Sequence, residues 1–172
     1  MTSKQLDCDR RAKASAGVVR MDVASSPKAL PVVRAAVGRV AEAEGFSENE
    51  VQSIVWAIDE ALANVIRHGY ENRNDQRIFL TLEPARAPDG RTGLRASIRD
   101  HGRQVEPGKI KGRDLDDVRP GGLGVHVIRS VMDDVAYSCP SDGGMLLRMT
   151  KYLTAGAVDA APSTTKAADH DK

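Results

Sequence analysis

Glu60 and Asn64 stand four residues apart in a segment whose apolar residues recur at helical spacing, so both side chains leave the same side of a helix. A glutamate in such a place can accept a proton from a hydroxyl group or orient a water molecule. The asparagine carbonyl is a hard oxygen donor suited to Mg²⁺, a cation that also binds phosphate oxygens. Taken alone, the pair more often marks a solvated helix face opposite an apolar stripe.

Asp100 and Gly102 follow downstream, just past the end of a predicted strand. A carboxylate there can accept a hydrogen bond from an exocyclic amine such as that of adenine, and a glycine lets the backbone approach a ligand closely. An Asp/Gly turn after a strand is also common without any ligand, so this segment alone does not define a site.

A third segment, Gly121-Gly122-Leu123-Gly124, runs straight into a predicted helix. Backbone N–H groups at the start of a helix, together with the helix dipole, can bind an anion such as phosphate. The segment is not a P-loop, because no Lys-Ser or Lys-Thr follows, and no βαβ unit surrounds it as a dinucleotide fingerprint requires. A flexible loop leading into a helix is the alternative interpretation.

The helix that carries the Glu/Asn pair is predicted over about residues 48–68. Ser47 is its expected N-cap, with Glu50 as the capping-box partner, and Gly69 ends it. We interpret Trp56 as a packing residue at the helix edge. Seven apolar side chains fall on an arc of roughly 120° at 3.6 residues per turn and predict the buried face: Val51, Ile54, Val55, Ile58, Leu62, Val65 and Ile66.

The remaining elements predict an α+β domain. Strands are expected over residues 18–23, 77–83, 93–99, 135–138 and 145–152, and two further helices over residues 29–43 and 123–132. A long loop, residues 102–120, is expected to contain one short helical turn at 114–118, and loops of this length are usually functional or disordered. The order β-α-α-β-β-loop-α-β-β predicts a two-layer sandwich with a mixed, mostly antiparallel sheet and helices on one face.

The bulk composition is that of an ordinary soluble domain. The chain has 172 residues, which fits one compact domain, and 41% of them are hydrophobic. A net charge of +1 gives no electrostatic case for direct binding to nucleic acid or to an anionic membrane. No apolar run approaches the roughly 20 residues of a membrane span. Cys8 and Cys139 make no disulfide framework, so we expect a cytoplasmic protein.

The two ends are expected to be flexible tails, residues 1–16 and 154–172. Both are polar and contain almost no large apolar residue, so they cannot bury enough surface to offset the entropy lost on ordering. The folded unit is therefore expected over residues 17–153.

Together, the three segments resemble the GHKL superfamily of ATPases and kinases, and within it the anti-sigma-factor serine/threonine kinases of bacterial partner-switching systems. Residues 60–70 resemble the N box, Asp100 to Gly102 with Pro107 the adenine-binding box, and residues 121–135 the second glycine box with its helix. The similarity covers about residues 18–153. Residues 103–106 depart from it, being more polar than is usual for the family, with Glu106 in the place of the acidic residue.

The resemblance implies ATP and Mg²⁺ as cofactors. Asn64 would hold the metal ion that bridges the phosphates, and Glu60 would be the general base that accepts the proton of a substrate hydroxyl. Asp100 would bind the adenine amino group, with Gly102 close to the base. Residues 121–124 would form a mobile lid over the phosphates.

The resemblance also implies a small anti-anti-sigma substrate with a STAS domain, a sigma factor as a second partner, and a homodimer. An ATP-responsive module that sequesters a regulator without catalysis is the alternative, although such a binder does not need Glu60. The catalytic half of a histidine kinase is a third reading. Since only about 17 residues precede the first strand, its phosphoacceptor would have to lie in another chain.

Overall fold

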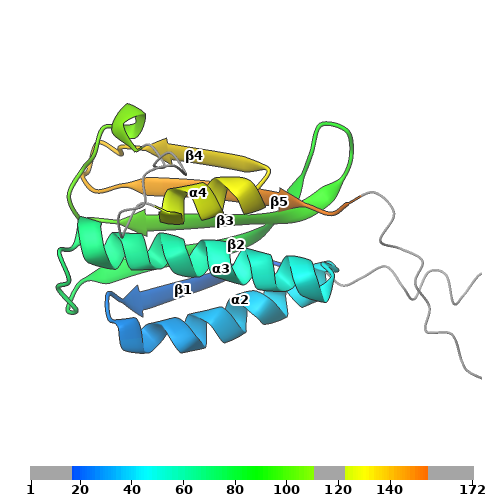
Figure 1. The fold of residues 1–172 in the computed structure, drawn as a ribbon, viewed down its shortest axis with the longest axis horizontal. Helices are drawn as coiled ribbons and strands as arrows, with labels where there is room; N and C mark the ends of the chain where they lie inside the picture. The colour runs from blue at the N-terminus through cyan, green and yellow to red at the C-terminus, as the bar shows by residue number, and fades with distance from the viewer. Residues whose placement is uncertain (1–16, 111–122, 155–172) are drawn as a thin grey trace, which may run out of the picture.

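The computed structural model describes residues 17–110 and 123–154, and its described elements form two layers (Figure 1). One layer is a sheet of five strands and the other consists of α-helices that cover one face of the sheet. The strands are β1 (Val19–Ala24), β2 (Arg77–Arg86), β3 (Thr92–Asp100), β4 (Asp134–Ser138) and β5 (Leu146–Tyr152). The helices are α2 (Leu30–Glu44), α3 (Glu48–Asn64) and α4 (Leu123–Val131). The expected α+β sandwich is confirmed.

Every pairing among the described strands is antiparallel, in the order β1-β2-β3-β5-β4. The parallel part of the mixed sheet that we expected is therefore not found there. The reason is topological: β4 runs parallel to β3, but β5 lies between them and pairs with both. The helix pair α2 and α3 likewise returns the chain, so that β2 lies antiparallel to β1.

The start of α3 has the expected capping box. The Ser47 hydroxyl accepts a hydrogen bond from the backbone N–H of Glu50 at 3.4 Å, and the Glu50 carboxylate accepts one from the Ser47 N–H at 2.9 Å. The regular α-helix ends at Asn64, earlier than predicted, and continues as a π-helical turn over Val65–Gly69. Such wide turns are rare and occur often at functional sites.

The core lies between the helices and the sheet. On β2 and β3, alternate residues face the helices and are buried, which is the period of two expected for a sheet with one covered face. They meet the apolar face of α3, and the largest of these side chains are Ile54, Ile58, Leu62, Ile78, Leu80, Leu82 and Ile98. Trp56 does not pack as expected: 68% of it is exposed, because it points away from the sheet.

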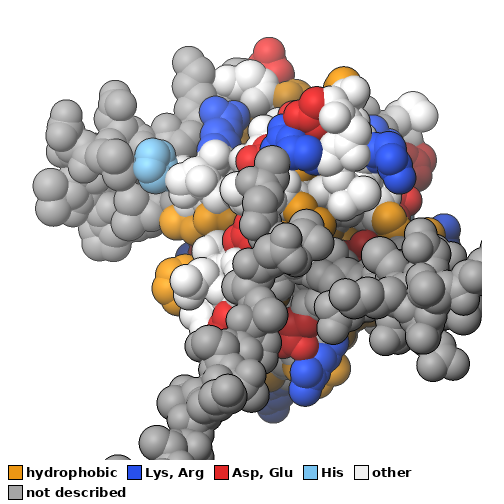
Figure 2. Space-filling view, turned by 90° about the vertical axis from the view of Figure 1, so that its right-hand side faces the viewer, with side chains coloured by type: hydrophobic (Ala, Val, Ile, Leu, Met, Phe, Trp, Pro, Cys, Tyr) orange, Lys and Arg blue, Asp and Glu red, His pale blue; other side chains and the backbone are white. Residues whose placement is uncertain are grey.

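The side of the molecule at the right of Figure 1 carries basic and acidic side chains interspersed with one another (Figure 2). In the turn between β2 and β3, for example, Arg91 pairs with Asp89 at 2.8 Å. Exposed pairs of this kind contribute little to stability. Among the described helices, none is long and apolar enough to cross a membrane.

Two short 3₁₀ turns complete the described elements. Pro27–Ala29 precedes α2, and Pro107–Lys109 lies in the long loop where no element was predicted. The helical turn expected at residues 114–118 lies outside the described residues.

Candidate active site

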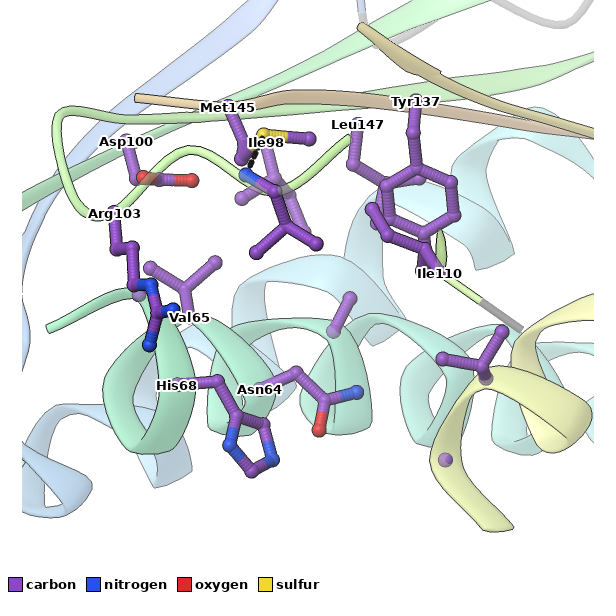
Figure 3. A pocket seen from close by; sticks show the side chains of 15 residues that line it. Asn64, Val65, His68, Ile98, Asp100, Arg103, Ile110, Tyr137, Met145 and Leu147 are labelled. Atoms are coloured by element: carbon purple, nitrogen blue, oxygen red, sulfur yellow. Dashed lines mark hydrogen bonds between the residues drawn. The ribbon is translucent and has the colours of Figure 1, made fainter. Parts of the chain in front are cut away.

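A cavity of about 330 Å³ lies between the C-terminal end of α3 and the sheet (Figure 3). Asn64 and His68 reach it from the helix side, while Asp100, Ile98 and Leu147 reach it from the sheet. The volume is at the lower end of the range for small-molecule sites, and such sites combine apolar walls with a few polar groups. The other described side chains around it include Val65, Arg103, Val105, Ile110, Val125, Tyr137 and Met145.

Asp100 is a buried carboxyl at the end of β3, with only 2% of the residue exposed. Its Oδ1 accepts a hydrogen bond from the Gly102 N–H at 2.8 Å, and its own N–H donates to the Met145 carbonyl at 3.0 Å. Burial raises the pKa of Asp100 above its ordinary value, and these backbone hydrogen bonds oppose the shift only in part. A buried carboxyl that lines an apolar cavity can select a ligand that offers a hydrogen-bond donor.

Gly102 packs against the backbone of the π-helical turn. A Cβ atom at this position would lie 2.5 Å from the Gly69 carbonyl oxygen, and the Arg103 N–H donates to the same oxygen at 2.9 Å. The glycine is therefore needed for the loop after β3 to reach α3. This contact also places Arg103 at the cavity.

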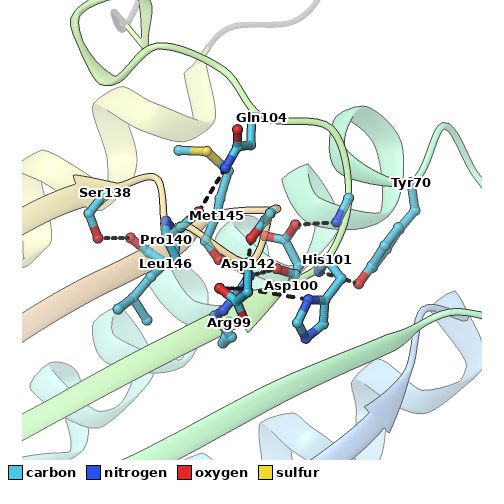
Figure 4. Close-up of polar contacts among 12 residues, drawn as sticks. Tyr70, Arg99, Asp100, His101, Gln104, Ser138, Pro140, Asp142, Met145 and Leu146 are labelled. Carbon is cyan, nitrogen blue, oxygen red and sulfur yellow. Dashed lines mark hydrogen bonds and ion pairs between the residues drawn. The ribbon is translucent and has the colours of Figure 1, made fainter.

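A polar cluster holds the end of β3 against the turn between β4 and β5 (Figure 4). The Arg99 guanidinium donates to the Asp142 carboxylate at 2.8 Å and to the Gly143 carbonyl at 2.7 Å. Gly144 has a φ of +62° and lies so close to Asp100 that a Cβ atom would overlap the Asp100 carbonyl. The backbone around the buried carboxyl is thus fixed from two sides.

Tyr70, the residue after the π-helical turn, also supports the backbone that follows β3. Its side chain is 1% exposed, and its hydroxyl accepts from the His101 N–H at 2.8 Å while donating to the Arg77 carbonyl at 2.6 Å. Burial raises the pKa of Tyr70, so the hydroxyl stays protonated and keeps both roles.

We predict that Tyr70→Phe lowers the free energy of unfolding by about 1–3 kcal/mol, because the His101 N–H and the Arg77 carbonyl would lose their partner inside the protein. Urea denaturation of the two proteins measures the difference. Phe79→Tyr is a suitable control, since it changes a ring by one hydroxyl at a residue that is 38% exposed. Equal stability of wild type and Tyr70→Phe would contradict the supporting role.

Glu60 and Asn64 lie side by side, as their spacing predicts. One guanidinium nitrogen of Arg67, Nη2, donates to Glu60 Oε1 at 2.7 Å and to Asn64 Oδ1 at 3.2 Å. On its other side Glu60 faces the start of α4, where any side chain on Gly124 would overlap the carboxylate. The glycine leaves room for the Glu60 carboxylate between α3 and the start of α4.

The structure brings most of the predicted site residues together. Asn64, Asp100 and Gly124 line the cavity, and Glu60 and Gly102 each pack against one of its glycines, Gly124 and Gly69 respectively. Leu123 is the first residue of α4, while Gly121 and Gly122 lie outside the described residues.

Several residues at the site were not predicted from the sequence. The apolar walls could have been found from the alternation of strands, since Ile98 and Leu147 point to the helix side. Arg67 could have been found from its spacing of seven residues from Glu60. His68 falls within the segment that resembles the N box, but no role was assigned to it. No sequence pattern indicated Arg103, because its position depends on the contact between the loop after β3 and the π-helical turn.

The antiparallel sheet under one layer of helices matches the fold of a GHKL-type ATPase domain. The family described as Histidine kinase-like ATPase domain matches residues 23–151, and the chain belongs to it. The expected membership of the superfamily is confirmed.

Within this family the chain is similar to proteins named Serine-protein kinase RsbW. The RsbW of Halalkalibacterium halodurans is 29% identical over 149 residues, covering 82% of this chain and 86% of that protein. The RsbW of Bacillus velezensis is 25% identical over 156 residues, covering 84% and 91%.

Two solved structures share the fold. The SiaB–SiaC complex from Pseudomonas aeruginosa matches with a TM-score of 0.57 at 15% identity, covering 88% of this chain and 100% of that one. The RsbU and RsbW domains of a Mycobacterium tuberculosis protein match with a TM-score of 0.54 at 20% identity and cover 79% of this chain. This chain spans only 32% of that polypeptide.

Proposed function

We propose that the protein is an ATP- and Mg²⁺-dependent serine/threonine kinase whose substrate is an anti-anti-sigma protein with a STAS domain. The observation that carries the proposal is the placement of Glu60 beside Asn64 and the start of α4, at one side of a cavity whose other side holds a buried carboxyl. The names of the relatives support a serine kinase.

Asp100 is the residue that we assign to the adenine ring. Its carboxylate can accept the exocyclic amino group, and apolar side chains such as Ile98 and Leu147 can pack against the flat faces of the base. Gly102 lets the loop after β3 lie against the Gly69 carbonyl, which helps to fix the position of Asp100.

The donor atoms at the other end fit a hard divalent cation. Asn64 Oδ1 and Glu60 Oε1 are both hard oxygens, and both already accept hydrogen bonds from a cationic group, the Arg67 guanidinium. We assign Asn64 as the protein ligand of Mg²⁺, which would supply charge neutralisation at the phosphates. We assign the N–H groups at the start of α4, from Leu123 and Gly124, to the phosphates.

Glu60 is the proposed general base. It accepts the proton of a serine or threonine hydroxyl as the hydroxyl oxygen bonds to the γ-phosphorus of ATP and the bond to ADP breaks. Positioning and charge neutralisation dominate such a transfer, so a carboxylate one helical turn from the metal ligand suits the role.

Three finer features belong to the same proposal: a sigma factor as second partner, assembly as a homodimer, and a cytoplasmic location. The second candidate function is a nucleotide-dependent binding module that holds a regulator without transferring phosphate. The presence of Glu60 beside the metal ligand favours the kinase.

Incubation of the protein with γ-labelled ATP, Mg²⁺ and the STAS-domain proteins of its own organism tests the proposal. We expect label on a serine or threonine of one STAS protein, and no label when EDTA replaces Mg²⁺. A nucleotide-dependent complex that forms without any transfer of label would instead establish the binding module.

A further inference from the structure

Arg67 contacts both of the polar residues that we assign to catalysis and metal binding, Glu60 and Asn64. It lies in the π-helical turn, and its Nη2 sits between Glu60 Oε1 and Asn64 Oδ1, at 2.7 Å and 3.2 Å. Its Nε donates to the Ala63 carbonyl at 3.3 Å, and this hydrogen bond helps to hold the guanidinium in position. One positive nitrogen thus joins the proposed base to the proposed metal ligand.

Arg67 and a metal ion would compete for Asn64 Oδ1, because two positive charges beside one amide oxygen repel each other. A Mg²⁺ held by Asn64 would take Oδ1 as its ligand. Arg67 Nη2, which lies 3.2 Å from that oxygen, would have to move away. While Glu60 is paired with Arg67, its Oε1 is engaged by the guanidinium and is not available to a substrate hydroxyl.

We propose that Arg67 is a positioning residue that neutralises Glu60 and occupies Asn64 Oδ1 in the nucleotide-free protein, and that it gives up this place to the Mg²⁺ that arrives with the nucleotide. The inference rests on the proposed function, since it takes Asn64 as the metal ligand. Its consequence is a coupling: Oε1 of Glu60 is released from Arg67 only when the metal and the nucleotide are both bound.

The exposure of the pair makes such an exchange feasible. The side chains of Arg67 and Glu60 are 47% and 32% exposed, so the ion pair is screened by water and contributes little to stability. A divalent cation held by phosphates carries twice the charge of the guanidinium. The displaced Arg67 side chain can return to solvent without leaving a buried charge behind.

The test is the effect of Mg²⁺ on ADP affinity, measured by calorimetry without any protein partner. For wild type, Arg67→Gln and Arg34→Gln, the dissociation constant of ADP is measured in EDTA and in saturating Mg²⁺, and their ratio gives the coupling. Arg34 of α2 is the matched control, because it pairs at 3.0 Å with Asp59, the neighbour of Glu60 on α3, and the two side chains have similar exposures of 43% and 28%.

We expect Arg67→Gln to increase the coupling about three-fold, the size of an exposed ion pair that no longer has to be broken, and Arg34→Gln to leave it unchanged. An unchanged coupling in Arg67→Gln overturns the inference. Weaker ADP binding in EDTA with unchanged coupling also overturns it and assigns Arg67 to the phosphates instead.

The result is separable from the fate of the proposed kinase. If Arg67→Gln increases the coupling but the wild-type protein transfers no phosphate to a STAS protein, the proposed exchange stands and the proposed kinase activity is wrong. If the wild-type protein transfers phosphate but Arg67→Gln leaves the coupling unchanged, the kinase activity stands and the exchange is wrong. Absence of any Mg²⁺-dependent binding of ADP overturns both.

Discussion

Glu60→Gln is expected to slow phosphate transfer to the STAS-domain partner by at least about 100-fold, the usual contribution of a general base. The glutamine keeps the shape of the side chain and can still accept from Arg67, but it cannot take the hydroxyl proton. ADP affinity in Mg²⁺ should change by less than about five-fold, since only an exposed ion pair is altered. Single-turnover transfer of labelled phosphate and calorimetry with ADP measure the two quantities.

Asp59→Asn is the matched control for this experiment. Asp59 precedes Glu60 on α3 and pairs with Arg34 at 3.0 Å, on the side of the helix toward α2, so its loss should leave transfer within about two-fold. Rapid transfer by Glu60→Gln would remove Glu60 as the base. A transfer defect of equal size in both variants would point to damage to α3 instead.

Local sequence signals were sufficient for the elements that carry the site. The apolar stripe and the capping box defined α3 at its start, and strand alternation located the hairpin that ends at Asp100. The i, i+4 spacing of Glu60 and Asn64 predicted that they are neighbours, which Arg67 confirms by contacting both. These features depend on the periods of helix and strand alone.

The features that the sequence left open depend on contacts between distant segments. Helical periodicity continues through Val65–Gly69, so it could not show where the α-helix becomes a π-helical turn. Gly102 was predicted to lie close to a ligand, and the structure adds a reason for this glycine that the sequence did not indicate, the close approach of the Gly69 carbonyl. Trp56 fits an apolar stripe by type, but only the packing of the layers decides that it faces solvent.

Asp100→Asn is the second substitution with a large expected effect. The asparagine keeps an oxygen that can accept the Gly102 N–H, so the turn is preserved. It places an amide where a carboxylate would accept the adenine amino group, and the loss of a hydrogen bond to a charged group should weaken ADP binding about 10- to 100-fold. Calorimetry with ADP at neutral pH measures the loss.

Asp100→Asn should not lower the stability of the fold. Because the pKa of Asp100 is higher in the folded protein than in the unfolded chain, ionising it costs stability as the pH rises through the interval between the two values. Asp100→Asn removes that cost, so its melting temperature at pH 7 should equal or exceed that of wild type. Weak ADP binding together with a lowered melting temperature would mean that the variant has lost the fold and not the adenine contact.

The raised pKa also gives the binding a pH dependence of known sign. If the ionised carboxyl accepts from adenine, wild-type affinity for ADP falls as the pH is lowered, and the fall begins above the ordinary aspartate value of 3.8. The phosphates of ADP titrate in both proteins, so the ratio of wild-type to Asp100→Asn affinity isolates the contribution of Asp100. That ratio should shrink toward acid pH, and a constant ratio would show that the charge of Asp100 is not what recognises the base.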